Sequence, residues 1–333
     1  MVLGPTSQEL ESLISASEGR VVDSKNRIKL ALKSFVDANE NVGSSANYHS
    51  NLPDPQSLMI SILDDSVVRN DALFTLLCLK TLKIFSRKQL NRGSITESDI
   101  LGILAVISPP LNDRIGAEGS NVLLNICHEV KNVQTLIRTP GVQQLISFLT
   151  EEDEALQANA AGAIQSVCFL AEGREHVRLC LGIPCLVDLL VSDNAKVVLR
   201  AVGAIHNLSS DPESIHIIRE CEGIPSLVLL LTSSDDAVSG SAAGALQNIS
   251  REVASRIIIK TLDVVPPLSV LLSSTDPQTQ LCAAGALLNI VGPDFDIEVG
   301  GAQRRRAFCR LISLTMATAA IYDCVFEKRP CLS

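Results

Sequence analysis

Hydrophobic residues in the central part of the chain recur at the spacing of one helix face. Three leucines that follow Pro225 are spaced i, i+3, i+4, which places them on one side of a short helix: Leu227, Leu230 and Leu231. A polar turn follows at 233–235, and the next stretch has apolar residues at helical spacing: Ala242, Ala245, Leu246 and Ile249. The pattern predicts a short helix, a turn and a longer helix.

This pattern recurs every 41 residues. Glycines within the predicted longer helix lie 41 positions apart, at Gly162, Gly203, Gly244 and Gly285. Leucines within the predicted short helix keep the same interval, at Leu145, Leu186, Leu227 and Leu268. One register held through four units without an insertion indicates an internal repeat.

Each unit is predicted to contain three helices. The segments 182–184 and 223–225 both read Gly-Ile-Pro, with Gly where one helix ends and Pro where the next begins. The Asp-Pro pair at 276–277 is typical of an N-cap residue and the first turn of the longer, third helix. A second Asp-Pro pair, at 211–212, opens the short first helix of a unit in the same way.

The recurring glycine of the third helix calls for a packing explanation. Gly inside a helix costs about 1 kcal/mol relative to Ala, so its recurrence indicates a compensating gain. We interpret it as the small residue that lets neighbouring third helices approach closely. Because no single unit can bury its leucine face alone, stacked units are expected to share one continuous core.

Two segments carry a resemblance to a known family. Residues 223–231 read Gly-Ile-Pro-x-Leu-Val-x-Leu-Leu and residues 242–249 read Ala-Ala-Gly-Ala-Leu-x-Asn-Ile. With two short helices and a longer one in about 40 residues, the chain resembles the armadillo (ARM) repeat family. The resemblance implies an all-α fold, a right-handed α-solenoid of three-helix ARM repeats with a 41-residue period.

The resemblance suggests three domains. It is clear across 114–292 and degenerate across 57–113, so we expect the solenoid to occupy 57–292. Residues 1–56 are expected to form an N-terminal helical cap and linker, since terminal repeats need a polar cover; a separate binding element is the alternative. The divergent segment 293–333 is expected to form capping helices.

The C-terminal segment also allows a membrane interpretation. An Arg-Arg-Arg run at 304–306 precedes a mostly apolar stretch that ends at 326, a pattern that also fits a basic membrane helix or tail anchor at 304–326. Its uninterrupted apolar run, 311–322, is too short to span about 30 Å of hydrocarbon. We therefore favour packing on the last repeat and expect no membrane association.

Composition excludes several classes of partner. The net charge of −9 argues against general nucleic-acid binding, and the absence of Trp with only 3% aromatic residues argues against single-strand binding by base stacking. Ten cysteines occur without a Cys-x-x-Cys pair, and the N-terminus shows no secretory signal. We expect reduced, buried thiols in a cytoplasmic protein, with a nuclear location as the alternative.

No motif for catalysis or cofactor binding is present. The sequence has no Gly-x-x-x-x-Gly-Lys phosphate loop, Gly-x-Gly-x-x-Gly turn, His-Glu-x-x-His pair or Gly-x-Ser-x-Gly elbow. We predict no enzyme activity, no catalytic residue, no cofactor and no small-molecule substrate.

Four residues could in principle bind zinc: Cys168, His176, Cys180 and Cys185. Cys168 shares its repeat position with Cys127, Ser209 and Ser250, so we favour a small-residue packing position and predict no metal site. His206 is interpreted as a polar surface residue, because the other repeats have no His there.

A column of asparagines is the informative polar feature. It comprises Asn125, Asn207, Asn248 and Asn289, with Ser166 in the gap. One interpretation is a hydrogen bond between units, to a loop carbonyl. The other follows from the resemblance: in ARM proteins the third helices line a concave groove, where this Asn pairs with the N–H and C=O of a bound extended peptide. A side-chain amide offers both donor and acceptor for that purpose.

Two arginines near this column are candidate anchors for a partner carboxylate. Arg200 lies seven residues before Asn207, and Arg251 lies three residues after Asn248. Equally, each could pair with an Asp or Glu of this chain, and exposed pairs contribute little. The side chains predicted to line the groove show no dominant charge, so the sequence does not name the partner.

Nuclear-import receptors of the ARM family resemble this chain but place Trp four residues before the Asn. Here Gly162, Gly203 and Gly244 occupy those positions, which makes the chain more similar to catenin-like and vacuolar-protein-like adaptors. We therefore predict a non-catalytic interaction scaffold that binds a protein segment, extended or helical, along the groove. The alternatives are a regulator of a small GTPase and a non-catalytic subunit of a ubiquitin-ligase assembly.

Overall fold

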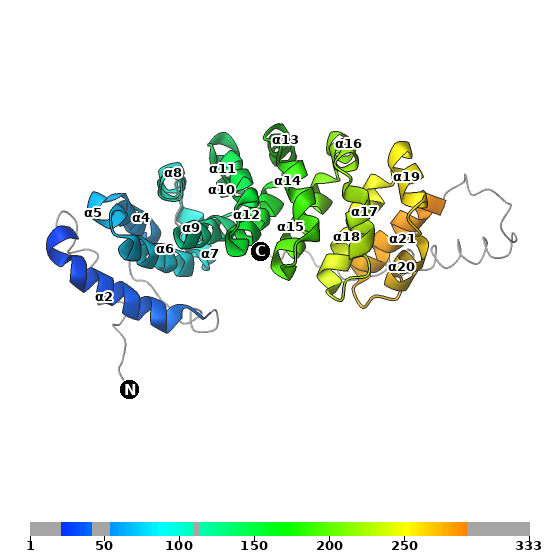
Figure 1. The fold of residues 1–333 in the computed structure, drawn as a ribbon. Coiled ribbons are helices and arrows are strands. Elements are labelled where there is room, and N and C mark those ends of the chain that lie inside the picture. The colour runs from blue at the N-terminus through cyan, green and yellow to red at the C-terminus, as the bar shows by residue number, and fades with distance from the viewer. Residues whose placement is uncertain (1–20, 42–53, 109–112, 292–333) are drawn as a thin grey trace, which may run out of the picture. The chain divides into compact units, whose positions relative to one another are not determined.

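The computed structural model describes residues 21–41, 54–108 and 113–291. All regular secondary structure in these residues is helical (Figure 1). The chain divides into two compact units, unit 1 at Met1–Cys180 and unit 2 at Leu181–Ser333. No helix in this described part has the length and apolar composition needed to cross a membrane. The expectations for 293–333, including 304–326, concern residues outside it.

The helices of each unit follow one another without a strand between them in the described ranges. Unit 1 contains α2 (Val21–Asn39), α4 (Pro55–Asp64), α5 (Ser66–Arg69), α6 (Ala72–Ser86), α7 (Gln89–Ser94), α8 (Glu97–Val106), α9 (Asp113–Ile126), α10 (Val130–Arg138), α11 (Gly141–Ser147), η1 (Phe148–Thr150), α12 (Glu154–Val167) and α13 (Ala171–Leu179). Unit 2 contains α14 (Gly182–Asp188), η2 (Leu189–Val191), α15 (Ala195–Leu208), α16 (Pro212–Glu220), α17 (Gly223–Leu230), α18 (Asp236–Ile249), α19 (Val253–Lys260), α20 (Val265–Leu271) and α21 (Pro277–Val291).

The longer helices, called third helices here, begin at a constant interval. They begin at Ala72, Asp113, Glu154, Ala195, Asp236 and Pro277, each 41 residues after the one before. Within unit 1, α6, α9 and α12 pack side by side, and within unit 2, α15, α18 and α21 do the same (Figure 1). The third helices α6 and α9 lie in the part of the chain where the repeat pattern is degenerate or begins to be clear.

The predicted helix starts are confirmed by their caps. The Asp276 carboxylate accepts the backbone N–H of Thr279 at 2.8 Å, and Pro277 is the first residue of α21. Asp211 accepts the backbone N–H of Ser214 at 3.2 Å, directly before Pro212 in α16. These side chains satisfy N–H groups that have no partner within the helix.

We expected Gly182 and Gly223 to end the first helix of their repeats, and this expectation is wrong, because each glycine begins the second helix. The left-handed conformation lies on the preceding residue, at Leu181 and Glu222 with φ of 58° and at Asp263 with φ of 47°. Gly223 instead begins α17, where a β-carbon would lie 3.0 Å from the Ile218 carbonyl oxygen. Close approach of two helices, and not a positive φ, therefore requires Gly at this position.

The leucine column forms the core of the repeats. All four members, Leu145, Leu186, Leu227 and Leu268, are fully buried. Two members of the glycine column, Gly244 and Gly285, allow the close packing of third helices that we predict for the column. A β-carbon on Gly285 would lie 2.3 Å from the Gln247 amide nitrogen.

His206 differs from the surface residue that we expected. It is half-buried. A β-carbon built on Gly244 would lie only 2.4 Å from His206 Nε2, so the imidazole occupies the space that a side chain at position 244 would need. Burial lowers the pKa of His206. Because Gly244 has no side chain, the His206 imidazole can lie in the interface between α15 and α18.

Helix α2 packs against α6, the third helix that comes earliest in the chain. The Phe35 and Phe85 rings meet edge to face with centroids 5.6 Å apart. The ammonium groups of Lys25 and Lys29 lie 2.8 and 2.9 Å from Asp71 Oδ2, just before α6 begins. These contacts of α2 support our proposal of a cap within residues 1–56, of which 1–20 and 42–53 lie outside the described part.

Candidate functional site

The asparagine column lies toward the C-terminal ends of the third helices. Its members, Asn125 on α9, Asn207 on α15, Asn248 on α18 and Asn289 on α21, are all half-exposed. The column and the other half-exposed or exposed side chains of the third helices are called the third-helix face below.

The amide nitrogens of this column bind the neighbouring third helix. Asn248 Nδ2 donates to Ser209 Oγ at 3.1 Å, and Asn289 Nδ2 donates to Ser250 Oγ at 3.1 Å. In unit 1, Asn125 Nδ2 donates to Ser86 Oγ at 2.9 Å. The structure thus contains hydrogen bonds between repeats, with a serine hydroxyl as the repeated acceptor.

The serine hydroxyls fix which way each amide points. Ser209 Oγ donates its proton to the His206 carbonyl oxygen at 2.6 Å, and Ser250 Oγ donates to the Gln247 carbonyl oxygen at 2.8 Å. A hydroxyl has one proton, so each serine can only accept from the asparagine. The nitrogen of the amide must face the serine, and the carbonyl oxygens of Asn248 and Asn289 accept no hydrogen bond from any other described residue.

The sequence did not reveal this role of the serines. Ser209 and Ser250 were interpreted only as small packing residues, in the position that Cys127 and Cys168 share. The available signal was that Ser86 stands 41 residues before Cys127 and 39 residues before Asn125. The joint recurrence of serine and asparagine at that separation could have identified the pair.

In unit 1 the amides of the third-helix face bind one another. Asn159 Nδ2 donates to the Ala117 carbonyl oxygen at 2.9 Å, and its Oδ1 accepts from Asn121 Nδ2 at 3.1 Å. Asn121 Oδ1 in turn accepts from Asn125 at 3.5 Å. These hydrogen bonds use both polar atoms of Asn121 and of Asn159 within the unit.

Charged groups on the same face of unit 1 are also paired. Lys83 Nζ lies 2.7 Å from Glu118 Oε2, and Lys80 Nζ lies 2.9 Å from Glu40 Oε1. The hydrogen bond from Lys80 is the main reason why the pKa of Glu40 is lowered. Arg87 adds a bond to the Glu40 carbonyl oxygen at 2.8 Å.

Unit 2 presents a different third-helix face. Its third helices carry Lys196, Arg200 and His206 but only one carboxylate, that of Asp236 in the first turn of α18. Arg200 is half-exposed, Arg251 is exposed, and neither forms an ion pair with a described residue. Glu252, which follows Arg251, pairs instead with Arg219 at 3.0 Å.

The described cysteines are free thiols. Cys168 is buried, and burial raises the pKa of its thiol, whereas Cys180 and Cys185 are half-buried. Cys221 is also half-buried, so the expectation of buried thiols is wrong for these three. In the described residues, no three His, Cys, Asp or Glu side chains are grouped so that they could hold a metal ion.

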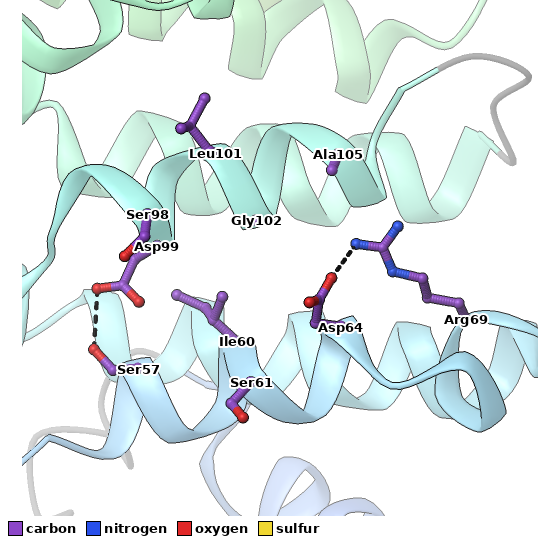
Figure 2. Close-up of a pocket in the computed structure, with 10 residues that line it drawn as sticks. All are labelled: Ser57, Ile60, Ser61, Asp64, Arg69, Ser98, Asp99, Leu101, Gly102 and Ala105. Carbon is purple, nitrogen blue, oxygen red and sulfur yellow. Dashed lines mark hydrogen bonds and ion pairs between the residues drawn. The ribbon is translucent and has the colours of Figure 1, made fainter.

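A shallow groove lies between α4 and α8 in unit 1 (Figure 2). Its volume is about 500 Å³. The Ser57 hydroxyl donates to Asp99 Oδ2 at 3.0 Å across it, and Arg69 pairs with Asp64 at 2.6 Å. The charged side chains that line this groove therefore already have partners.

Comparison with known proteins agrees with this arrangement of helices. A family model described as the Armadillo/beta-catenin-like repeat matches four segments: 130–169, 178–210, 211–251 and 255–292. Among curated proteins, no sequence matches the chain.

Solved structures of engineered proteins have a similar fold. An engineered protein from the Northeast Structural Genomics Consortium is 26% identical over 71% of this chain and 96% of its own, with a TM-score of 0.65. A designed armadillo repeat protein is 21% identical over 70% of this chain and 98% of its own, with a TM-score of 0.64. Another, solved in complex with the peptide (KR)4, is 22% identical over 72% of this chain and all of its own, with a TM-score of 0.62.

Four matched repeats, the helical fold and these similar structures together identify the chain as an armadillo repeat solenoid, and residues 130–292 belong to the armadillo repeat family.

Proposed function

We propose that this chain is a non-catalytic interaction scaffold, and that α15, α18 and α21 bind an extended segment of a partner protein. The observation that carries the proposal is the row of half-exposed amides whose nitrogens face the repeat junction. The carbonyl oxygens of Asn248 and Asn289 are left as acceptors that recur once per repeat.

The spacing of these acceptors suits an extended chain. Packed helices lie about 8–10 Å apart, and an extended chain advances about 3.3–3.6 Å per residue. One acceptor is therefore available for about every two to three residues of the bound segment. Each would accept a backbone N–H, which every residue except proline provides.

Such binding depends little on the sequence of the partner, because the amide row reads only its backbone. The designed armadillo repeat protein that binds (KR)4 has this fold. We assign no reaction to the face, because the Ser209 hydroxyl donates to a carbonyl oxygen and not to a base that could activate it as a nucleophile.

The test uses peptides selected on the full-length protein from a random peptide display library. The double variant Asn248→Ala/Asn289→Ala should bind these peptides roughly tenfold more weakly, because two neutral hydrogen bonds of about 0.5–1.5 kcal/mol each are lost. Dissociation constants and unfolding free energies would be measured for the same preparations.

A matched control separates binding from repeat stability. The double variant Ser209→Ala/Ser250→Ala removes the acceptors at the junction and keeps both asparagines. It should lose stability to a similar extent but bind the peptides more tightly than the asparagine double variant, because both amide carbonyl oxygens remain. Equal affinities in all three proteins would show that the amides serve only the junction, and failure to select any peptide would reject the scaffold proposal.

A further inference from the structure

We propose that the third-helix face of unit 2 selects acidic peptide segments, an inference that rests on the proposed function. The chain as a whole has a net charge of −9, yet α15 and α21 contain no Asp or Glu, and α18 contains only Asp236, in its first turn. The carboxylates of Asp235 and Asp276 accept N–H groups at the starts of α18 and α21 and are occupied there as caps. The cationic face is therefore a local feature of the third helices.

Two arginines at or beside this face are available to a partner: Arg200 on α15, and Arg251, which follows the end of α18 by two residues. Arg200 and Arg251 make no ion pair with a described residue, and neither is buried. Unit 1 provides the contrast, because Lys80 and Lys83 of α6 are held by Glu40 and Glu118. In unit 1 the chain supplies the acidic partner itself, whereas in unit 2 the corresponding carboxylates are missing from the face.

The arginines lie on opposite sides of the asparagine column. Arg200 lies seven residues before Asn207 within α15, about 10 Å along the helix at about 1.5 Å per residue. Arg251 follows Asn248 by three residues, just beyond the end of α18. Successive side chains of an extended peptide point in opposite directions. A segment lying along the column can therefore direct one acidic side chain toward each arginine.

The amide row favours a peptide over other polyanions. Asn248 and Asn289 present carbonyl oxygens, which need hydrogen-bond donors in the ligand. A peptide backbone provides an N–H at nearly every residue, whereas a phosphodiester backbone has no donor. A row of hydrogen-bond acceptors with cationic side chains beside it is therefore suited to binding an acidic peptide.

The experiment measures fluorescence anisotropy of labelled peptides with the full-length protein. The probes are (Asp-Glu)4, (Ser-Gln)4 and (Lys-Arg)4, with (dT)8 as the nucleic-acid probe. We expect (Asp-Glu)4 to bind about tenfold more tightly than (Ser-Gln)4, and (Lys-Arg)4 to bind more weakly than either. The advantage of the acidic peptide should shrink as the salt concentration rises, because the arginines are solvent-accessible.

Two charge reversals with the same change in net charge locate the site. Arg251→Glu should weaken binding of (Asp-Glu)4 about fivefold or more. Lys260→Glu, at an exposed residue on the last turn of α19, should leave it unchanged. Equal loss in both variants would show attraction to overall charge and would overturn the inference.

The remaining outcomes distinguish the two proposals. If (Ser-Gln)4 or (Lys-Arg)4 binds as well as (Asp-Glu)4 and responds to Asn248→Ala, the scaffold proposal stands and the acidic preference is rejected. If (dT)8 binds as tightly as (Asp-Glu)4, the assignment to peptides is rejected. If no peptide binds, the proposed function itself fails.

Discussion

The imidazole of His206 occupies space beside Gly244 that the side chain of any other residue at position 244 would fill. Gln247 and Gly285 repeat this arrangement one repeat later, with an amide in place of the imidazole. A glutamine therefore fits the position. The difference between the two junctions is that only one of them contains a group that titrates near neutral pH.

His206→Gln should make the stability less dependent on pH. Because burial lowers the pKa of His206 in the folded protein, the unfolded chain takes up the proton first as the pH falls below about 6.5. The wild type should then lose up to about 1.4 kcal/mol per pH unit through this group, and the loss ends below its folded pKa. Urea unfolding at pH 7.5 and pH 5 would measure this, and equal losses in the two proteins would contradict it.

The glycine column could be predicted from the sequence, because a helix breaker that recurs in helices requires a steric reason. The left-handed residues could not. Glu222 has no side-chain property that favours a positive φ, and neither Leu181 nor Glu222 is a residue type that favours this conformation. Likewise, the burial of His206 follows from a glycine 38 residues later in the chain, to which no local pattern points.

At the scale of helices, the repeat junction depends on a pair of side chains. Ser209 accepts from Asn248 across α15 and α18, and Ser250 accepts from Asn289 across α18 and α21. Helix positions and caps were predictable because apolar periodicity and capping residues are local signals. The pairing of Ser209 with Asn248 was not, because the two residues are 39 positions apart and either could have faced solvent.

A double-mutant cycle tests this junction. Ser209→Ala and Asn248→Ala should be coupled by about 0.5–1.5 kcal/mol, since either change alone removes the same hydrogen bond. Ser209→Ala combined with Asn289→Ala is the control, because these residues belong to different junctions, and its effects should add. Unfolding free energies from urea titration would be compared, and coupling of equal size in both cycles would refute the pairing.

At the scale of the whole molecule, both units hold carboxylates whose pKa is lowered. Hydrogen bonds from Lys25 and Lys29 lower the pKa of Asp71 in unit 1. In unit 2, burial raises the pKa of Glu252, but hydrogen bonds from Ser255 and Arg219 outweigh it and the net shift is downward. These groups stabilise the fold while they are ionised.

The stability of the protein should therefore fall steeply below about pH 4. Below this pH the carboxylates of the unfolded chain bind protons, whereas those of the folded protein remain ionised because their pKa is lower. The free energy of unfolding therefore decreases as the pH falls. Asp71→Asn keeps a capping side chain for α6 and removes the charge. Its stability should lie below that of the wild type at pH 7, and the two should converge at low pH. A difference that stays constant with pH would disprove the role of the charge.

The pairing of Ser250 with Asn289 also bears on how such a chain can grow. Consider a second copy of residues 212–252 inserted after Glu252. Its copy of Asn248 would meet Ser250, which now accepts from Asn289, and its copy of Gly244 would meet Gln247, which now lies against Gly285. At these two pairs of positions, the inserted module would meet its neighbours through contacts that the protein already makes. Lengthening by tandem duplication therefore requires no new junction chemistry, and each added module contributes one more amide to the row.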